Sequence, residues 1–325
     1  MFWILGFVIF FYIFYRLYLH FFPSPSIKPN GKYVLISGCD SGFGHKLAVQ
    51  LDQKGFHVLA GVYLSNNISK LEKELSSKAT VFSLDITKQQ DIDGIYELVR
   101  KKTNTLHALV NNAGIGEGGY VDWTSLEFMR QTMDVNFFGH VAMTKTFLPL
   151  LISKRYSRVV NISSVAGILA APNMSAYSAS KFALESFSDC LRREMISWGL
   201  HVSIIEPGFM RTPIIEGLNK SFDDFWTKLS ADVQERWGKD YIKQFYQNRA
   251  NNIFIKHAED PMKVVRALEH AVMNTKPEIR YRPGWQASIV YLPLTFLPAS
   301  VVDFILKKFN KPSITPAFVS KQSKD

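Results

Sequence analysis

From residue 32 onward, short apolar runs rich in β-branched residues alternate with longer segments whose apolar positions recur at helical spacing. The short runs lack clean alternation of polar and apolar positions, which is typical of strands buried in a parallel sheet. They predict strands at Lys32–Ser37, His57–Tyr63, Thr80–Leu84, Leu106–Asn111, Ser157–Ile162 and Leu200–Ile205. The longer segments predict helices near residues 43–54, 88–102, 124–153, 175–198 and 261–274. This alternation predicts an α/β fold with a doubly wound parallel sheet and helices on both faces.

The chain begins with an apolar stretch that has no charged side chain in residues 1–15 and, after Arg16, continues to Phe22. As a helix, residues 1–22 span about 33 Å, enough to cross the hydrocarbon core of a bilayer. The stretch has neither the basic start nor the small-residue cleavage site of a removed signal peptide. We therefore expect a retained N-terminal membrane anchor, with an interfacial helix as the alternative. Residues 23–30, which include three prolines, are expected to form a stiff linker.

Basic residues follow the anchor, at Arg16, Lys28 and Lys32, and none precedes it. The positive-inside rule then predicts that the main domain lies in the cytosol.

A second apolar stretch covers residues 284–306, and Pro293 and Pro298 interrupt it. Prolines break a continuous helix, so this stretch is expected to be a helical hairpin that dips into the membrane interface or covers a substrate entrance. Ordinary core packing is the alternative. Lys307 and Lys308 follow directly and suit an edge that faces lipid headgroups. We assign residues 284–325 to a membrane-associated segment with a basic tail.

Composition narrows the class of protein. The 325 residues are 47% hydrophobic and 20% charged, as in a folded protein with a large core. The net charge of +10 comes from basic residues spread along the chain, so we expect no nucleic-acid binding. Two cysteines, Cys39 and Cys190, provide no disulfide framework. The histidines are scattered, and no metal site is expected.

The candidate catalytic group lies between residues 164 and 181. Tyr177 and Lys181 are four residues apart, so on a helix they share one face, about 5–6 Å apart at Cβ. A neighbouring ammonium favours the phenolate, and a tyrosine with a lowered pKa can exchange a proton with an alcohol or a carbonyl. Ser164, at the end of the preceding predicted strand, could hydrogen-bond the same substrate oxygen.

A glycine-rich turn follows the first predicted strand and precedes the first helix. Its pattern, Gly-x-x-x-Gly-x-Gly over residues 38–44, allows a tight turn and close approach of a pyrophosphate to the helix N-terminus. The candidate cofactor-binding residues of this turn are Gly38, Ser41, Gly42, Phe43 and Gly44. A dinucleotide cofactor is therefore predicted.

The end of the second predicted strand reads Gly-Val-Tyr-Leu-Ser over residues 61–65. It carries neither the acid that binds the ribose of NAD nor a cation for the 2′-phosphate of NADP. Since no cation lies within the glycine turn either, NAD is favoured, with NADP left open. Asp85, at the end of the third strand, could accept a hydrogen bond from the adenine; its alternative role is at the start of the next helix. Asn111–Gly114, after the fourth strand, is predicted to lie beside the cofactor, or to be a plain turn.

Together these motifs resemble the short-chain dehydrogenase/reductase family, over about residues 30–285. The matching positions are, in chain order, Gly38, Gly42, Gly44, Asn111, Asn112, Ala113, Gly114, Asn136, Ser164, Tyr177, Lys181, Pro207, Gly208 and Thr212. The resemblance implies a mostly parallel seven-stranded Rossmann sheet in a catalytic domain over residues 31–283. It also implies NAD or NADP as the cofactor and the interconversion of an alcohol and its carbonyl as the activity.

The resemblance also implies roles. The expected catalytic residues are Asn136, Ser164, Tyr177 and Lys181. Tyr177 is the general acid/base, Lys181 lowers its pKa and holds the ribose, and Asn136 supports Lys181 and a proton-relay water. The expected cofactor-binding residues are those of the glycine turn together with Asp85, Asn111, Ala113, Gly114, Tyr177, Lys181, Pro207, Gly208 and Thr212.

Three segments are similar to the membrane-bound retinol dehydrogenase and 17β-hydroxysteroid dehydrogenase branch: Gly38–Gly44, Glu206–Phe209 and Tyr291–Pro298. That branch carries N-terminal anchors in the endoplasmic reticulum membrane and often prefers NAD. A retinoid or steroid substrate is therefore expected, and a homodimer, which is common in the family, is a possible assembly. The alternatives are a 3-hydroxybutyrate-type dehydrogenase and a non-catalytic membrane scaffold, and the presence of all the catalytic residues disfavours the scaffold.

An insertion at about residues 209–260 is rich in aromatic residues, several of them at helical spacing. They either line an apolar substrate pocket or form the core of an inserted helix pair, and the sequence leaves both readings open. A hydroxy-acid substrate would need a cation instead, and Arg211, Lys220 and Lys228 are available.

Overall fold

The computed structural model describes residues 6–7, 10–11, 14, 21, 24–116, 118–216, 222–250, 252–309 and 314–322. The predicted anchor at residues 1–22 therefore lies largely outside the described residues. Seven parallel strands form one sheet in the order β3-β2-β1-β4-β5-β6-β7. They are β1 (Tyr33–Ile36), β2 (His57–Val62), β3 (Thr80–Ser83), β4 (Ala108–Asn111), β5 (Arg158–Ile162), β6 (His201–Ile205) and β7 (Arg280–Tyr281). The doubly wound sheet expected from the sequence is confirmed, with each of the six predicted strands inside its predicted range.

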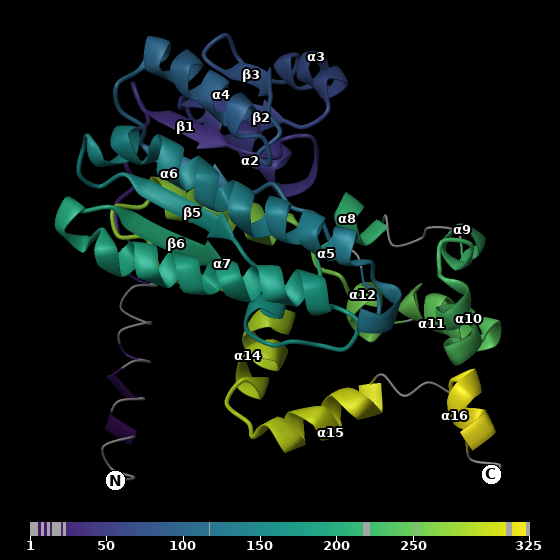
Figure 1. Cartoon of the computed structure of the whole chain (residues 1–325). Helices are drawn as coiled ribbons and strands as arrows, with labels where there is room; N and C mark the ends of the chain where they lie inside the picture. The colour runs from purple at the N-terminus through teal and green to yellow at the C-terminus, as the bar shows by residue number, and fades with distance from the viewer. Residues whose placement is uncertain are drawn as a thin grey trace.

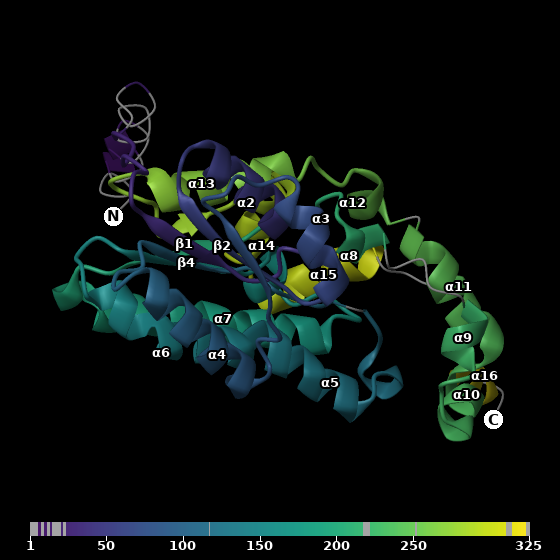
Figure 2. The ribbon, with the colours of Figure 1, turned by 90° about the horizontal axis from the view of Figure 1, so that it is seen from above.

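Helices cover both faces of the sheet (Figures 1 and 2). One face is covered by α2 (Gly42–Gln53) and α13 (Met262–Met273), which pack against each other. The other face is covered by α4 (Gln89–Lys102), α6 (Gly139–Ile152) and α7 (Ser175–Glu194). Figure 2 shows the sheet lying between these two layers.

The core divides into two apolar clusters because side chains alternate across a strand. In β1, Val34 and Ile36 join the cluster beneath α2 and α13, whereas Leu35 joins the cluster beneath α4 and α6. All three side chains are fully buried. Burial on both faces explains why the strands read as continuous apolar runs.

The order of strands reverses between β1 and β4, which are neighbours at the centre of the sheet. Ligands of such sheets bind at the carboxyl ends of the strands beside this reversal. The glycine turn follows β1, Asn112–Gly114 follow β4 and Ser164 follows β5. The fold thus gathers the predicted site residues at one edge.

The helix expected over residues 124–153 is interrupted. It consists of α5 (Leu126–Met133), a π-helical turn at Asp134–Phe138 and α6. Taken as one segment, Leu126–Ile152 is the one helix in the described part of the chain that is long and apolar enough to cross a membrane, and 44% of its apolar window is buried. Since α6 packs on α4 and β4, this segment is a core helix of the domain.

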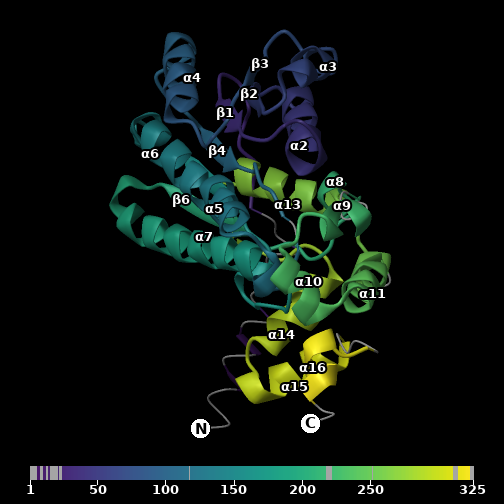
Figure 3. The ribbon, with the colours of Figure 1, turned by 45° about the vertical axis from the view of Figure 1, so that its right-hand side comes forward.

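Shorter elements complete the chain. The short helix α3 (Ile68–Glu72) lies between β2 and β3 in the chain. The connections also contain single 3₁₀ turns at Ser65–Asn67, Val121–Trp123, Val165–Gly167 and Ile196–Trp198. The insertion contains α8 (Pro213–Glu216), α9 (Phe222–Trp226), α10 (Ala231–Trp237), α11 (Lys239–Ala250) and α12 (Ile253–Lys256). The C-terminal segment contains a π-helical turn (Gln286–Tyr291), α14 (Leu292–Leu294), α15 (Ala299–Phe309) and α16 (Ala317–Gln322). Figure 3 shows α15 and α16 on the same side of the molecule.

Candidate active site

The turn between β1 and α2 has the geometry of an anion-binding site. Gly38 has φ +70° and Gly42 has φ +65°, a region that residues with a side chain enter only under strain. A Cβ on Gly38 would lie 2.7 Å from Ala113 Cα, so this turn packs directly against the exit of β4. A Cβ on Gly42 would meet nothing within 4 Å. Ser41, the N-cap of α2, makes no capping hydrogen bond through its side chain, so N–H groups of the first turn remain for a phosphate.

Two other residues of this turn fix its shape. A Cβ on Gly44 would lie 2.6 Å from the carbonyl oxygen of Gly38, which leaves no room for a side chain there. Phe43, half-buried, packs on the apolar cluster beneath α2 and α13. The predicted glycine turn is therefore a tight, pre-formed backbone cradle.

β4 ends in a buried side chain, Asn111, and the segment that follows it is half-buried. The Asn111 side chain is fully buried, and its Nδ2 donates to Thr144 Oγ1 (3.0 Å) and Asn161 Oδ1 (2.8 Å). Asn111 thus holds β4 to β5 and α6, and its side chain faces the interior rather than the predicted cofactor edge. Asn112 Nδ2 donates to the carbonyl oxygens of Ser37 (2.9 Å) and Gly38 (2.8 Å), which ties this segment to the glycine turn. Ala113 and Gly114 follow at the cofactor edge.

Asp85 shapes the tight turn that precedes α4. Its Oδ1 accepts hydrogen bonds from the N–H (3.0 Å) and Oγ1 (2.6 Å) of Thr87, and Lys88 Nζ lies 3.4 Å from Oδ2. Burial acts to raise the pKa of Asp85, but the contacts with Thr87 and Lys88 outweigh it and lower this pKa below its ordinary value. The Asp85 side chain thus holds the turn before α4 and does not cap that helix, which begins at Gln89, and its contact with adenine stays a prediction.

Asn136 lies in the π-helical turn between α5 and α6 and is fully buried. Its Nδ2 donates to the carbonyl oxygen of Ile115 (2.8 Å) and to Ser180 Oγ (3.1 Å), and its Oδ1 accepts from the N–H of Ile115 (2.9 Å). Isolated π turns are frequent at functional sites. Here the turn directs Asn136 between the exit of β4 and α7, beside the helix that carries Tyr177 and Lys181.

Ser164, Tyr177 and Lys181 come together as predicted. Ser164 caps the 3₁₀ turn after β5, with its Oγ accepting from the N–H of Ala166 (3.1 Å), and it hydrogen-bonds Tyr177. Lys181 is buried and its Nζ donates to the carbonyl oxygen of Ile162 (2.8 Å). The same Nζ lies 5.7 Å from the centroid of the Tyr177 ring. The three side chains thus lie together at the exit of β5, as the predicted proton exchange at one substrate oxygen requires.

The charge states of this group differ from the expectation. Burial raises the pKa of Tyr177, and the hydrogen bond with Ser164 opposes this only in part. Burial also lowers the pKa of Lys181 to about 8, while the charge of Glu185 opposes that shift. The pKa of Tyr177 is therefore not lowered by Lys181, because desolvation disfavours the phenolate.

The segment after β6 packs against the C-terminal π turn. The carbonyl oxygen of Pro207 accepts from the N–H of Val165 (3.0 Å), which joins the exits of β5 and β6. A Cβ on Gly208 would lie 3.0 Å from Gln286 Cβ, and the N–H of Phe209 donates to Gln286 Oε1 (3.1 Å). Thr212 is buried and its Oγ1 donates to the carbonyl oxygen of Met210 (3.3 Å). The predicted Pro207, Gly208 and Thr212 thus lie at the same edge as Ser164.

A large cavity of about 810 Å³ opens beside the catalytic group. Ser164 and Tyr177 are among its lining residues, and the rest of its wall is mainly apolar. The apolar and aromatic wall comes from segments far apart in the sequence: Val165, Leu169, Phe209, Tyr241, Phe245, Phe254, Val290, Tyr291, Leu294, Ile305 and Leu306. The C-terminal segment therefore forms part of the wall of the cavity.

The aromatic residues of the insertion serve both roles that the sequence left open. Trp123, Val233, Tyr241 and Ile242 form a separate buried cluster, against which further aromatic side chains of α9, α10 and α11 pack. Tyr241 also lines the cavity, as does Phe245. The insertion is thus a small aromatic core with one side turned to the cavity.

Comparison with known proteins agrees with this geometry. Residues 32–222 match the model of the family described as short chain dehydrogenase. The chain belongs to the short-chain dehydrogenase family. It is 41% identical to mouse retinol dehydrogenase 5 over 290 residues, which cover 86% of this chain and 89% of that protein. It is 35% identical to bovine 17-beta-hydroxysteroid dehydrogenase type 6 over 288 residues, or 87% of this chain and 90% of that protein.

Solved structures share the fold of this short-chain dehydrogenase. A short-chain dehydrogenase from Streptomyces avermitilis matches with a TM-score of 0.67 at 24% identity, covering 92% of this chain and 99% of that chain. A relative from Burkholderia phymatum, solved in complex with NAD, matches with a TM-score of 0.68 at 19% identity, covering 86% and 96%. The Rossmann-type sheet implied by the sequence motifs is thereby confirmed.

Sequence reasoning missed two residues that shape the candidate site of this short-chain dehydrogenase. Asp40, in the glycine turn, reaches the exit of β2, where its carboxylate accepts hydrogen bonds from the N–H groups of Tyr63 (2.7 Å) and Leu64 (2.9 Å). Gln286, fully buried, holds the segment after β6. An acid inside the glycine pattern was a visible signal for Asp40, whereas Gln286 is 77 residues from the segment it holds and had none.

Proposed function

We propose that this short-chain dehydrogenase interconverts an apolar secondary or allylic alcohol, a retinoid or a hydroxysteroid, and its carbonyl with NAD. The proposal rests on one observation: Ser164 and Tyr177 both line a mainly apolar cavity of about 810 Å³. Sites of this size suit a substrate that buries most of its surface against apolar side chains. The retinol and hydroxysteroid dehydrogenases among the relatives support the same substrate class.

Four residues of the chain would perform the proton chemistry. Tyr177 gives a proton to the carbonyl oxygen in reduction and takes it from the hydroxyl in oxidation. Ser164 orients that oxygen, and Asn136 holds the exit of β4 against α7 so that Lys181 faces the ribose. Because burial raises the pKa of Tyr177, oxidation, which needs the phenolate to take the hydroxyl proton, should accelerate as the pH rises.

The glycine turn fits a dinucleotide, since the space at Gly42 is open and the first turn of α2 has free N–H groups. Phosphates would rest at Gly38, Ser41 and Gly42, and the nicotinamide end would lie near Pro207–Gly208 and Thr212. When bound, the nicotinamide supplies the hydride acceptor of the oxidation and the hydride donor of the reduction.

Asp40 supports NAD rather than NADP. An acid at the end of the second strand binds the ribose hydroxyls of NAD, and here the acid comes from the glycine turn, anchored by the backbone of β2's exit. Its negative charge would repel a 2′-phosphate. We expect Asp40→Asn to raise kcat/KM for NADP relative to NAD by roughly tenfold, equivalent to about 1.4 kcal/mol. The control is Asp93→Asn, an exposed acid on α4; an unchanged ratio in Asp40→Asn would contradict the assignment.

The cavity argues against a small hydroxy acid as substrate. Among its described lining residues, Lys308 is the single cation. Arg211, one of the three candidate cations, donates to the carbonyl oxygen of Ala258 (2.9 Å) and does not line the cavity. Lys220 lies outside the described residues, and Lys228 is not part of the lining.

Membrane association would deliver such a substrate. Residues 1–22 are proposed as the anchor in the endoplasmic reticulum membrane, 23–30 as the linker, 31–283 as the catalytic domain and 284–325 as a membrane-associated segment. Exposed apolar side chains of the last segment support this, with Ile289, Phe296 and Phe304 all more than 60% exposed. Figure 1 shows α14 leading from the catalytic domain to α15. Extraction with carbonate tests the anchor, and protease protection of sealed microsomes tests the cytosolic orientation.

A homodimer is proposed through the faces of α5–α6 and α7. Leu126, Phe138 and Phe182 on these helices are 59%, 56% and 43% exposed, which is unusual for large apolar side chains of a core layer. Light scattering of the detergent-solubilised protein, with Phe138→Ser as the variant, tests this assembly; a wild-type protein that is monomeric at working concentration would contradict it.

The decisive experiment is nucleotide reduction by the full chain in detergent, with NAD and NADP side by side. All-trans-retinol, a hydroxysteroid and 3-hydroxybutyrate are the test substrates. We expect turnover of retinol or the steroid with NAD, and a loss of two to four decades in Tyr177→Phe, the usual scale of general acid/base catalysis. Turnover of 3-hydroxybutyrate alone would discard the apolar substrate. Equal turnover by Tyr177→Phe would discard the assigned acid/base.

A further inference from the structure

Four ionisable residues follow one another along a single face of α7. Tyr177, Lys181, Glu185 and Asp189 are each four residues apart, so their side chains are neighbours on one stripe of the helix. The proposed chemistry uses the first two. Glu185 is the next group along this stripe, one helical turn beyond Lys181.

Glu185 is buried against the segment that carries Ser164. Its side chain is 9% exposed, and it lies beside Ser163, the residue directly before Ser164. Gly167 shows how close the packing is, because a Cβ placed there would lie 2.6 Å from Ser163 Oγ, 3.1 Å from the carbonyl oxygen of Lys181 and 3.2 Å from Glu185 Cγ. The carboxyl group is therefore enclosed between α7 and the exit of β5.

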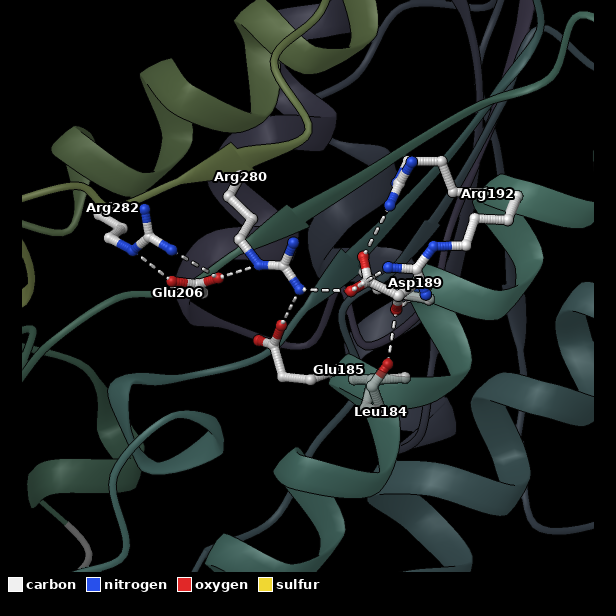
Figure 4. A network of polar contacts seen from close by, with 10 residues as sticks. Leu184, Glu185, Asp189, Arg192, Glu206, Arg280 and Arg282 are labelled. Carbon is white, nitrogen blue, oxygen red and sulfur yellow. Dashed lines mark hydrogen bonds and ion pairs between the residues drawn. The ribbon is translucent and has the colours of Figure 1, made fainter. Parts of the chain in front are cut away.

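Arg280 of β7 is the cation that faces Glu185, and it also contacts two other acids. Arg280 Nη2 lies 3.3 Å from Glu185 Oε2 and 3.1 Å from Asp189 Oδ2, and Arg280 Nε lies 2.9 Å from Glu206 Oε1. Glu206 is fully buried and also contacts Arg282 Nε at 2.6 Å. Figure 4 shows Arg280 at the centre of this network, with Glu185, Asp189 and Glu206 around it. Glu185 thus receives only part of the charge of one arginine.

Among three ionisable neighbours of Lys181, Tyr177 and His140 are neutral, and Glu185 is the acidic one. Tyr177 is neutral because burial raises its pKa. His140 is also neutral, since burial and then the charge of Lys181 lower its pKa to about 3. The charge of Glu185 opposes the lowering of the Lys181 pKa. Burial, and then the charge of Glu206, raise the pKa of Glu185 itself to about 7.

We propose that Glu185 is a positioning residue for the reaction: from one helical turn behind Lys181, its buried carboxylate keeps the Lys181 ammonium charged at the site. This inference rests on the proposed function, in which charged Lys181 holds the ribose of the cofactor and faces Tyr177. Loss of the carboxylate would leave a buried ammonium without its acidic neighbour, and such a group gives up its proton more readily.

The experiment compares Glu185→Gln with wild type in the binding of NADH, followed by fluorescence from pH 6 to pH 10. Glutamine keeps the size of the side chain and removes its charge. Two opposite charges about 6 Å apart at a protein site shift a pKa by about one unit or more. We therefore expect the alkaline loss of NADH affinity to move to lower pH by about one unit. At pH 8 the dissociation constant should rise several-fold more than at pH 6.5.

Asp189→Asn is the matched control, because Asp189 contacts the same Arg280 but lies two helical turns from Lys181. It should lower thermal stability without moving the alkaline limb of the NADH profile. Should Glu185→Gln fail to fold, Glu185→Asp keeps the charge one methylene farther from Lys181 and should give a smaller shift in the same direction.

The outcomes are distinct. A wild-type protein that binds no NADH at any pH would refute the proposed function. NADH binding with superimposable pH profiles in wild type and the Glu185 variants would overturn this inference alone. A shift of equal size in Asp189→Asn would also overturn it, because the effect would then belong to the network as a whole.

Discussion

Replacing Gly38 by alanine tests whether the cofactor turn depends on the close approach of two backbone segments. Gly38 has φ +70°, and a Cβ would lie 2.7 Å from Ala113 Cα and 3.0 Å from the Ala113 nitrogen. Both atoms belong to the backbone, so neither can turn away as a flexible side chain would. The exit of β1 and the exit of β4 would have to separate.

The expected loss of stability has two parts. An alanine in this left-handed region costs about 1–2 kcal/mol, and overpacking of a close contact costs about 1–3 kcal/mol. Together they predict a loss of about 2–5 kcal/mol. For a domain of this size, 1 kcal/mol corresponds to a shift of about 2–4 °C in Tm, so Tm should fall by roughly 10 °C.

Gly42→Ala is the matched control, because Gly42 has nearly the same φ, +65°, with nothing within 4 Å of an added Cβ. It should lose about 1–2 kcal/mol from strain alone. Thermal unfolding of the full chain in detergent without nucleotide, followed by circular dichroism, measures both variants. Equal Tm values for Gly38→Ala and Gly42→Ala would refute the reasoning, since the contact with Ala113 would then carry no energy.

Three further outcomes are expected. Gly94→Ala, in the exposed interior of α4, should raise stability by about 0.8–1 kcal/mol, the difference in helix propensity; an unchanged Tm would contradict this. Phe147→Ala, fully buried in α6, should cost about 3–5 kcal/mol in urea unfolding. Burial lowers the pKa of both His107 and His140 to about 3, so these two residues take up protons on unfolding below about pH 6.5, whereas Glu185, with its pKa raised to about 7, releases one. Net uptake means that stability should fall by about 1 kcal/mol per pH unit between pH 6.5 and pH 5, and a flat Tm over that range would exclude the effect.

The sheet could be predicted from the sequence because its strands are buried on both faces and separated by helices of regular pattern. The seventh strand escaped a prediction from the residues, since β7 consists of Arg280 and Tyr281 alone. Neither length nor apolar pattern marks such a strand. It exists because Ile204 and Ile205 of β6 offer it a partner, which is a tertiary cause.

The interruption of the long helix over residues 124–153 could not be predicted for a similar reason. The residues of Asp134–Phe138 have no helix-breaking glycine or proline among them. The π turn accompanies the contacts of Asn136 with Ile115 and Ser180, which come from other parts of the chain. The local sequence therefore predicted a helix here, but not its π turn, which occurs together with hydrogen bonds to distant parts of the chain.

The site was predicted in its composition but not in its electrostatics. The spacing of Tyr177 and Lys181 placed both on one face of α7, and Ser164 lies beside Tyr177 as expected. The direction of the Tyr177 pKa shift was missed because burial depends on the whole fold. Asn111 was assigned to the cofactor from its motif, whereas its side chain binds Thr144 and Asn161 inside the domain.

The position of β7 at the end of the sheet has a consequence for how the protein is made. Ribosomes deliver the N-terminal part of a chain first, so β1 to β6 emerge before Arg280 and Arg282. Until then Glu206 has neither of the cations that contact it in the finished fold, and burial of an unpaired charge is strongly unfavourable. A nascent chain must therefore keep this corner hydrated, and one cut short before residue 280 would retain an open strand edge at β6. The surroundings of Glu206 are thus completed late in biosynthesis. Truncated products should be recognisable to chaperones and proteases by this incomplete edge of the sheet.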